Sequence, residues 1–186
     1  MTDALRADAI AALTAFTAPN ADQERLRRDY LDHLDCHPDG MLKAGPPAHL
    51  TASCLVLDES GERVLLTHHR RARRWFQFGG HLEPGDAGLH AAASREAREE
   101  SGLPDLVVRA GIVELNRHRL LGDFGPCQEH LDVRYAAVVP AGAAPAVSAE
   151  SLDVRWWPVD ALPEGPTGEV AMLVTAARAA LAVVQA

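Results

Sequence analysis

The stretch Gly79–Leu103, GGHLEPGDAGLHAAASREAREESGL, reads as a glycine-rich turn that leads into a helix with several acids. Residues three and four positions apart on a helix share a face, so Glu96, Glu99 and Glu100 form one stripe. Three carboxylates on adjacent turns repel one another unless a cation lies between them. Mg²⁺ prefers oxygen ligands of this kind and completes its shell with waters and substrate phosphates. The stretch therefore predicts a metal-dependent site for a phosphorylated substrate.

Length and composition indicate one globular domain with a small appendage. The chain has 186 residues, of which 47% are hydrophobic and 24% are charged, and this suffices to bury a core. The formal net charge of −8 argues against sequence-independent nucleic-acid binding, because such binding depends on an excess of Lys and Arg. We therefore expect no stable nucleic-acid partner, whereas a local positive cluster can still bind a small phosphorylated substrate.

The cysteines and the N-terminus favour a cytoplasmic location. Cys36, Cys54 and Cys127 are few, odd in number and unpatterned, which is typical of reduced thiols rather than of a disulfide framework. Cys36 adjoins His37, but no second pair follows at ligand spacing, so we do not expect a structural zinc. We also expect no signal peptide and no membrane span, because the chain lacks the apolar runs that they need.

Two amphipathic helices are predicted at the start of the chain. Apolar residues recur on one helical face from residue 3 to residue 17. Asn20 and Gln23 then match a capping box that opens a second helix, which reaches about Asp35. The simplest interpretation is a helical pair packed against the main domain. A homodimer contact or a cover over the substrate is the alternative.

The segment HPDGMLKAGPP, which ends at Pro47, is rich in turn formers and is the predicted boundary. It separates an N-terminal helical extension, residues 1–48, from a main domain, residues 49–186. In the main domain, short apolar segments are expected as strands at 49–57, 63–69, 106–119, 129–139 and 153–158, and helices are expected at 88–101 and 167–184. This pattern predicts an α+β fold with a mixed sheet and flanking helices.

Arg70, Arg71, Arg73 and Arg74 precede the aromatic segment WFQF and the glycine turn. A solvated loop and a phosphate-binding patch are both open interpretations. The second is attractive because this is the densest positive cluster of an acidic chain and it adjoins the acidic helix. On that interpretation, the candidate substrate-binding residues are Arg70, Arg71 and Arg74. The aromatic residues of WFQF are expected in strands and core rather than against a base.

The turn and the acidic helix together resemble the Nudix hydrolase signature. That signature is a glycine, five residues, an acid, seven residues, Arg-Glu, an apolar residue, any residue, Glu-Glu, any residue, a glycine and an apolar residue. The matching positions here are Gly80, Asp86, Arg95-Glu96, Glu99-Glu100 and Gly102-Leu103. Asp86 stands where the signature has Glu, eight residues separate it from Arg95, and Ala97 is small for its apolar position. From about His49 onward, the resemblance implies a Nudix-like α/β/α sandwich with a mixed sheet.

The resemblance implies a Mg²⁺- or Mn²⁺-dependent hydrolase of a diphosphate (pyrophosphate) linkage in a nucleoside-diphosphate-type small molecule. Glu96, Glu99 and Glu100 would bind the metal together with the backbone carbonyl of Gly80. Glu99 or Glu100 could accept the proton of the attacking water. Arg95 would orient the loop and the acids rather than contact the substrate. Bound metal positions water, lowers its pKa and neutralises charge on the phosphoryl oxygens.

The sequence leaves the general base and the substrate open. Glu129, His130, Glu150 and Asp153 lie outside the signature and are alternative loop bases. The substrate could instead be a non-nucleotide diphosphate, such as an isoprenoid diphosphate used by a hydrolase or an isomerase. A ligand-sensing domain that lost turnover is another interpretation, but the presence of all three helix glutamates argues against it.

Overall fold

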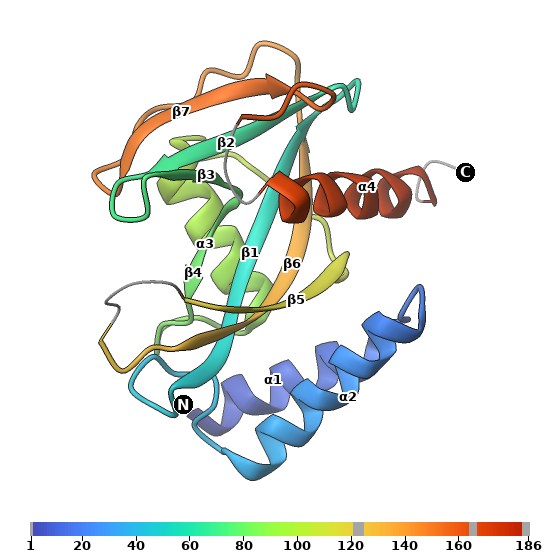
Figure 1. Cartoon of the computed structure of the whole chain (residues 1–186), viewed down its shortest axis with the longest axis vertical. Coiled ribbons are helices and arrows are strands. Elements are labelled where there is room, and N and C mark those ends of the chain that lie inside the picture. Colours follow the sequence, from blue (N-terminus) through green and yellow to red (C-terminus); the bar gives the residue numbers. More distant parts are fainter. Residues whose placement is uncertain (1, 121–124, 164–166, 184–186) are drawn as a thin grey trace.

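A computed structural model describes residues 2–120, 125–163 and 167–183 and shows a mixed sheet with helices on both faces (Figure 1). The elements in chain order are α1 (Thr2–Ala15), α2 (Ala21–Cys36), β1 (Ala48–Asp58), β2 (Arg63–His69), β3 (Arg74–Phe76), β4 (Phe78–His81), α3 (Leu89–Ser101), β5 (Glu114–Arg119), β6 (Glu129–Val139), β7 (Ser151–Pro158) and α4 (Thr167–Val183). The predicted α+β fold with a mixed sheet is therefore confirmed.

Strand β1 is the centre of the seven-stranded sheet. The main path runs β3-β2-β1-β6-β5, while β4 also pairs with β1 and β7 with β2. β1 runs parallel to β6 along its whole length, from the pair Ala48↔Glu129 onward. One edge of β1 is shared by β2, which pairs near Val56, and by β4, which pairs near Thr51. The predicted β1–β2 hairpin is confirmed, and β4 brings the glycine turn to the middle of the sheet.

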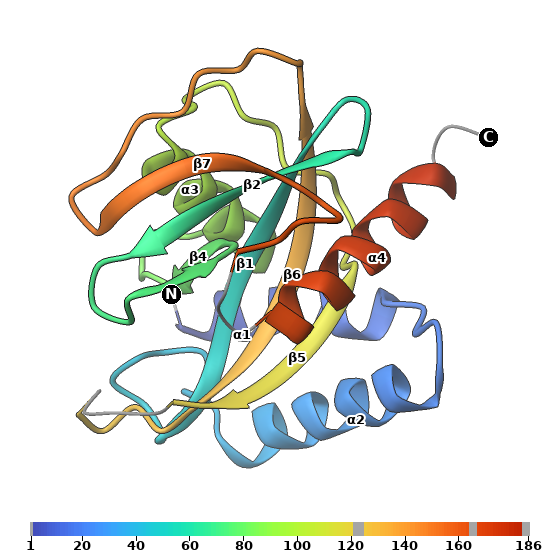
Figure 2. The same cartoon turned by 45° about the horizontal axis from the view of Figure 1, so that its top comes forward.

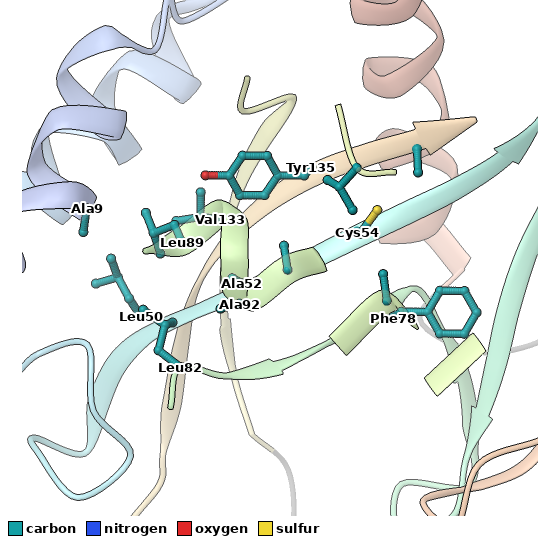
Figure 3. Packing of buried hydrophobic residues seen from close by; sticks show 14 of the residues in the cluster. Ala9, Leu50, Ala52, Cys54, Phe78, Leu82, Leu89, Ala92, Val133 and Tyr135 are labelled. Carbon is teal, nitrogen blue, oxygen red and sulfur yellow. The ribbon is translucent and has the colours of Figure 1, made fainter. Parts of the chain in front are cut away.

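The two faces of the sheet carry separate apolar clusters. Because side chains alternate along a strand, Cys54 of β1 packs with the α3 cluster, whereas Leu55 and Leu57 pack against α4. Figure 2 shows α3 and α4 on opposite sides of the sheet. Figure 3 shows Ala92 of α3 close to β1, and the side chains of Ala92 and Ala97 are fully buried. Small residues on this face of α3 let the acidic helix approach the sheet closely.

Helices α1 and α2 belong to the main core rather than to a separate unit. Leu5 and Leu13 of α1 are buried in the same cluster as Leu50 of β1, together with Tyr30 and Leu34 of α2. Figure 1 shows both helices packed against the lower end of the sheet. The apolar stripes that suggested a dimer contact are thus already covered within the chain. The homodimer stays a prediction that would need another surface.

Only one of the two hydrogen bonds expected of the capping box of α2 is present. The Asn20 side chain accepts a hydrogen bond from the Gln23 N–H at 3.0 Å, as expected of an N-cap. The predicted reciprocal bond from the Gln23 side chain back to Asn20 is wrong. Instead, Gln23 donates to the Leu115 carbonyl at 2.9 Å and accepts from the Leu115 N–H at 2.7 Å. This pair of bonds fastens α2 to β5.

A residue of α1 caps the acidic helix α3. Gly88 precedes α3 and has no side chain to serve as a cap. Asp8 Oδ2 of α1 takes this role by accepting a hydrogen bond from the Leu89 N–H at 2.9 Å. A carboxylate at a helix N-terminus also interacts favourably with the helix dipole. A Cβ at position 88 would collide with this carboxylate, so a larger residue there would displace the cap.

The segment between α3 and β5 differs from the expectation. A strand was expected from residue 106, but β5 begins only at Glu114, and Val108 makes a single bridge to Ala137. Gly111 has a φ of 107°, which interrupts an extended chain. Part of the loop between β5 and β6 lies outside the described residues, as does the expected end of the last helix at Val184.

The Asp8 cap yields a stability prediction. Asp8→Ala removes the only side chain that caps Leu89 in the described residues, so we expect the free energy of unfolding in urea to fall by about 1 kcal/mol. Asp32→Ala is the matched control, because Asp32 is exposed in the interior of α2. Equal unfolding free energies for the two variants would contradict the capping role.

Candidate active site

A cavity of about 500 Å³ lies on the face of the sheet that α4 covers. Thr51 and Ser53 of β1 line it and share a face with Leu55, which packs against α4. Glu169 of α4 also contributes to the lining. The remaining lining residues are Thr67, His69, Arg71, Ala72, Arg74, Phe76, Gln77, Gly79, Gly80, Glu100, His118, Arg119, Leu120, His130, Asp132 and Arg134. Most of these residues are of polar type, and they include both arginines and carboxylates.

The glycine turn lies directly against the carboxylates of α3. Glu100 is 5% exposed, and its Oε2 accepts a hydrogen bond from the Gly79 N–H at 3.0 Å. A Cβ at Gly80 would lie 2.6 Å from Glu96 Oε1, and a Cβ at Gly79 would collide with Ser53. Glycine at position 79 is required for the close pairing of β4 with β1, and glycine at position 80 leaves room for the Glu96 carboxylate.

Arg95 joins the acids and the loop that precedes α3. Its Nε and Nη2 donate to the two Asp86 oxygens at 3.0 Å each. Nη1 donates to Glu96 at 3.0 Å and to Glu99 at 3.3 Å. Nη2 also donates to the His81 carbonyl at 3.1 Å. Asp86 has a shorter side chain than the Glu of the signature, and one extra residue separates it from Arg95. Asp86 still forms two parallel hydrogen bonds with Arg95, and these hold the loop in place.

The arginines of the β2–β3 region separate into two groups. Arg71 and Arg74 line the cavity. Arg70 instead donates to the carbonyls of Ala149 and Ser151, each at 3.0 Å. Arg70 is outside the cavity lining because its guanidinium fastens the chain at the start of β7. A role for Arg70 in substrate binding stays a prediction, and these hydrogen bonds make it weaker than the predictions for Arg71 and Arg74.

A family model for the NUDIX domain matches residues 47–176, which include the sheet, the glycine turn and the acidic helix. The chain belongs to the Nudix family. Helices α1 and α2 lie before the matched region, although they pack into the same core. The Nudix resemblance of the sequence is thus confirmed, and the Asp8 cap is an addition from outside the family domain.

Solved structures with the same fold include several Nudix proteins. The C. elegans Ap4A hydrolase has a TM-score of 0.57 and 19% identity over 72% of this chain and 97% of that chain. The E. coli dihydroneopterin triphosphate pyrophosphohydrolase has a TM-score of 0.56 and 14% identity over 67% of this chain and 91% of that chain. At these identities the similarity establishes the Nudix fold and leaves the substrate unassigned.

A curated relative is the isopentenyl-diphosphate Delta-isomerase of Mycolicibacterium vanbaalenii. It is 39% identical over 90 residues, which cover 38% of this chain and 49% of that protein. The chain therefore spans about half the length of this curated relative. The proteins similar to this chain thus include hydrolases and an isomerase.

The three glutamates of α3 carry carboxylate oxygens, which are the ligands that a divalent metal such as Mg²⁺ prefers. Burial raises the pKa of Glu100 to about 8, against the opposing hydrogen bond from Gly79, and the neighbouring glutamates raise it further. Burial likewise raises the pKa of Glu96. Within the described residues, Glu96, Glu99 and Glu100 each keep one oxygen that accepts no hydrogen bond. A divalent cation would favour the ionised forms of Glu96 and Glu100, and the unpaired oxygens of the three glutamates are the type of ligand that Mg²⁺ or Mn²⁺ prefers.

The floor of the cavity is a buried polar network that sequence reasoning missed. Asp132 accepts hydrogen bonds from Thr51 at 3.0 Å and from Ser53 at 2.7 Å. Arg134, which is 1% exposed, donates to Asp132 and to Glu114, each at 2.9 Å. Removing one partner of a buried ion pair typically costs about 3–5 kcal/mol, so Asp132, Arg134 and Glu114 depend on one another for stability. The alternation in β6 was visible, but its polar face was not recognisable as buried without the β1–β6 pairing.

Two of the alternative loop bases are already paired. Glu129 accepts a hydrogen bond from Arg117 at 2.7 Å, and this bond lowers the pKa of Glu129. Asp153 forms an ion pair with Arg155. Neither carboxylate lines the cavity. These contacts make both acids poor candidates for a base.

The other two alternative bases, His130 and Glu150, are connected to the site in different ways. His130 lines the cavity. The charge of Glu150 contributes to raising the pKa of both Glu96 and Glu100, after the larger effect of burial. Glu150 therefore stays a candidate beside the glutamates of α3.

The Asp86–Arg95 pair yields a prediction for stability and pH. Burial alone would raise the pKa of Asp86, but Arg95 and the Glu83 N–H hold it below the ordinary value of 3.8. As pH falls, the Asp86 carboxylate therefore takes up its proton at a higher pH in the unfolded chain than in the folded chain. The stabilisation that the ionised carboxylate gives to the fold is present above pH 3.8 and is lost as pH falls through the folded pKa. We expect Asp86→Asn to lower the free energy of unfolding by about 1–3 kcal/mol at neutral pH and by less below pH 3.8.

Denaturant unfolding at several pH values measures this effect. Asp105→Asn is the control, because Asp105 is exposed in the segment after α3. A loss of stability in Asp86→Asn that is the same at all pH values would show that the carboxylate charge is not the cause.

Proposed function

We propose that this Nudix protein is a Mg²⁺- or Mn²⁺-dependent hydrolase of the diphosphate linkage in a nucleoside-diphosphate-type small molecule. The observation that carries the proposal is the lining of one cavity by Arg71 and Arg74 as well as by Gly80 and Glu100. Phosphate oxygens would be bound by the arginines while the acids hold the metal. A diphosphate can contact the arginines through its phosphate oxygens and the acids through a metal ion that they share.

Each side chain has a distinct proposed role. Glu96, Glu99 and Glu100 would hold the metal with the Gly80 carbonyl, and Glu99 or Glu100 would accept the proton of the attacking water. Arg95 would position these acids without touching the substrate. A bound divalent metal supplies charge neutralisation at the phosphoryl oxygens and lowers the pKa of water.

Several residues that line the cavity could form hydrogen bonds with a nucleoside, which supports a nucleoside as the first candidate. Polar side chains such as Thr67 and Gln77 line the cavity with the Asp132–Arg134 floor. Phe76 also lines it and offers an aromatic surface, although the sequence suggested only a structural role. An isoprenoid diphosphate remains the second candidate because a curated relative is an isopentenyl-diphosphate isomerase.

We also infer a reducing, cytoplasmic location. Cys36, Cys54 and Cys127 are all free thiols, which is typical of reducing compartments. Among the described residues, no helix combines the length and apolar character that crossing a membrane requires.

A release assay tests the proposed chemistry. The panel consists of nucleotide sugars, dinucleotides, nucleoside triphosphates and isoprenoid diphosphates, each with Mg²⁺ or Mn²⁺. We expect hydrolysis of a nucleoside diphosphate derivative, and a fall in kcat of at least about 100-fold in Glu99→Gln and Glu100→Gln. Glu62→Gln, an exposed glutamate outside the cavity, is the control.

The outcomes of this assay separate the candidate functions. Activity that survives in both glutamate variants would contradict metal-dependent catalysis by α3. Conversion of isopentenyl diphosphate without phosphate release would indicate an isomerase. A ligand that raises the melting temperature without turnover of any compound would favour a sensor.

The cavity arginines yield a separate kinetic prediction. Arg71→Ala and Arg74→Ala should raise KM for the substrate by about tenfold or more, because each removes a charge-assisted contact to phosphate. Arg109→Ala is the control, because Arg109 is exposed outside the cavity. Unchanged KM in both cavity variants would show that the phosphates bind elsewhere.

A further inference from the structure

Three imidazoles and one thiol, His49, His81, Cys127 and His130, form a compact group beside the proposed active site. We refer to them as the His/Cys cluster. His49 lies in β1, His81 ends β4, Cys127 precedes β6 and His130 belongs to β6. Their nitrogen and sulfur atoms all lie within 4.8 Å of one another. The fold thus brings four metal-binding side chains from distant parts of the sequence to one point.

The three distances from the Cys127 sulfur to the imidazole nitrogens are close to the edges of a tetrahedral metal site. Cys127 Sγ lies 3.3 Å from Nε2 of His49 and 3.2 Å from Nε2 of His130. Nε2 of His81 lies 3.8 Å from the same sulfur. Zinc bonds of about 2.3 Å to sulfur and about 2.0–2.1 Å to nitrogen place tetrahedral ligand atoms about 3.5 Å apart. A thiol has one proton and is a weak acceptor, so hydrogen bonds alone do not satisfy three nitrogens around it.

One imidazole is already held as a metal ligand requires. His49 Nδ1 lies 2.9 Å from the Pro46 carbonyl oxygen. Because a carbonyl only accepts, Nδ1 carries the proton and Nε2 keeps a free lone pair. Nε2 faces the sulfur of Cys127. Hydrogen bonds of this kind fix the tautomer and the ring orientation of metal-binding histidines, and His49 is fully buried.

We propose that the His/Cys cluster binds a transition-metal ion of the Zn²⁺ class in a closed tetrahedral site. Four protein ligands fill the tetrahedral shell, which is typical of structural zinc rather than of catalytic zinc. Nitrogen and sulfur ligands also distinguish this site from the α3 glutamates, whose oxygens suit Mg²⁺ or Mn²⁺. The sequence-based expectation of no structural zinc considered only Cys36 and His37, which lie outside this cluster.

The ion would join three segments at the edge of the cavity. His81 directly follows Gly80, and His130 lines the cavity two residues before Asp132. A bond from each to one ion fixes the glycine turn relative to the cavity floor. The site therefore acts by positioning, and it does not depend on the identity of the diphosphate substrate.

Metal analysis of the full-length chain without a histidine tag tests the proposal. The reduced protein is stripped of metal, loaded with Zn²⁺ in excess Mg²⁺, desalted and analysed by mass spectrometry for metals. We expect one Zn²⁺ to remain per chain. The Co²⁺-loaded protein should show the intense visible bands of a tetrahedral ion and a near-ultraviolet charge-transfer band from thiolate sulfur.

Matched variants identify the ligands. In competition with a chelator, Cys127→Ala and His81→Gln should weaken Zn²⁺ binding by at least about 100-fold, beyond the loss typical of an outer-shell partner. Cys36→Ser and His37→Gln are the controls, because both residues are exposed outside the cluster, and they should bind Zn²⁺ as the wild type does.

Several results would overturn the proposal. One is a wild-type protein that retains no Zn²⁺. Another is a Co²⁺ spectrum with the weak bands of a six-coordinate ion and no charge-transfer band. Retention of Zn²⁺ by Cys127→Ala and its loss from Glu99→Gln would place the ion at α3 instead. The wild-type Co²⁺ spectrum decides the question even where a variant fails to fold, and it is independent of hydrolytic activity.

Discussion

The close approach of β4 to helix α3 is the constraint on which the active site depends. Glycine at positions 79 and 80 lets the backbone lie against Glu96 and Glu100, and the Gly79 N–H donates to the buried Glu100 carboxylate. A carboxylate in this position is expensive to ionise, since burial raises its pKa. A divalent cation would relieve that cost, so the packing of the turn against Glu100 supports the proposed metal site.

Other contacts hold this arrangement from several directions. Arg95 links Asp86 to the glutamates and to the backbone at His81. Asp8 caps α3 from outside the family domain, while the apolar face of α1 packs into the main core. The proposed ion in the His/Cys cluster would fix the residue that follows Gly80. The position of the acids is therefore set by parts of the chain that range from the first helix to β6.

The sequence predicted the parts of the site that depend on local spacing. The stripe of Glu96, Glu99 and Glu100 follows from helical periodicity, and the strand–turn–helix order follows from short-range patterns. Contacts between distant segments were not predictable in this way. Parallel pairing of β1 with β6 places residues 49–53 beside residues 130–134, and this pairing creates both the Asp132 floor and the His/Cys cluster. Neighbouring arginines also look equivalent in sequence, yet Arg70 holds the start of β7 while Arg71 lines the cavity.

The central claim is that the α3 glutamates form the divalent-metal site of the Nudix domain. Titration of Mn²⁺ followed by electron paramagnetic resonance tests it directly, with Zn²⁺ supplied first to saturate the His/Cys cluster. The wild-type chain should remove free Mn²⁺ from solution, and Glu96→Gln and Glu100→Gln should each weaken that binding by about tenfold or more. Equal Mn²⁺ affinity in the wild type and in both variants would contradict the claim.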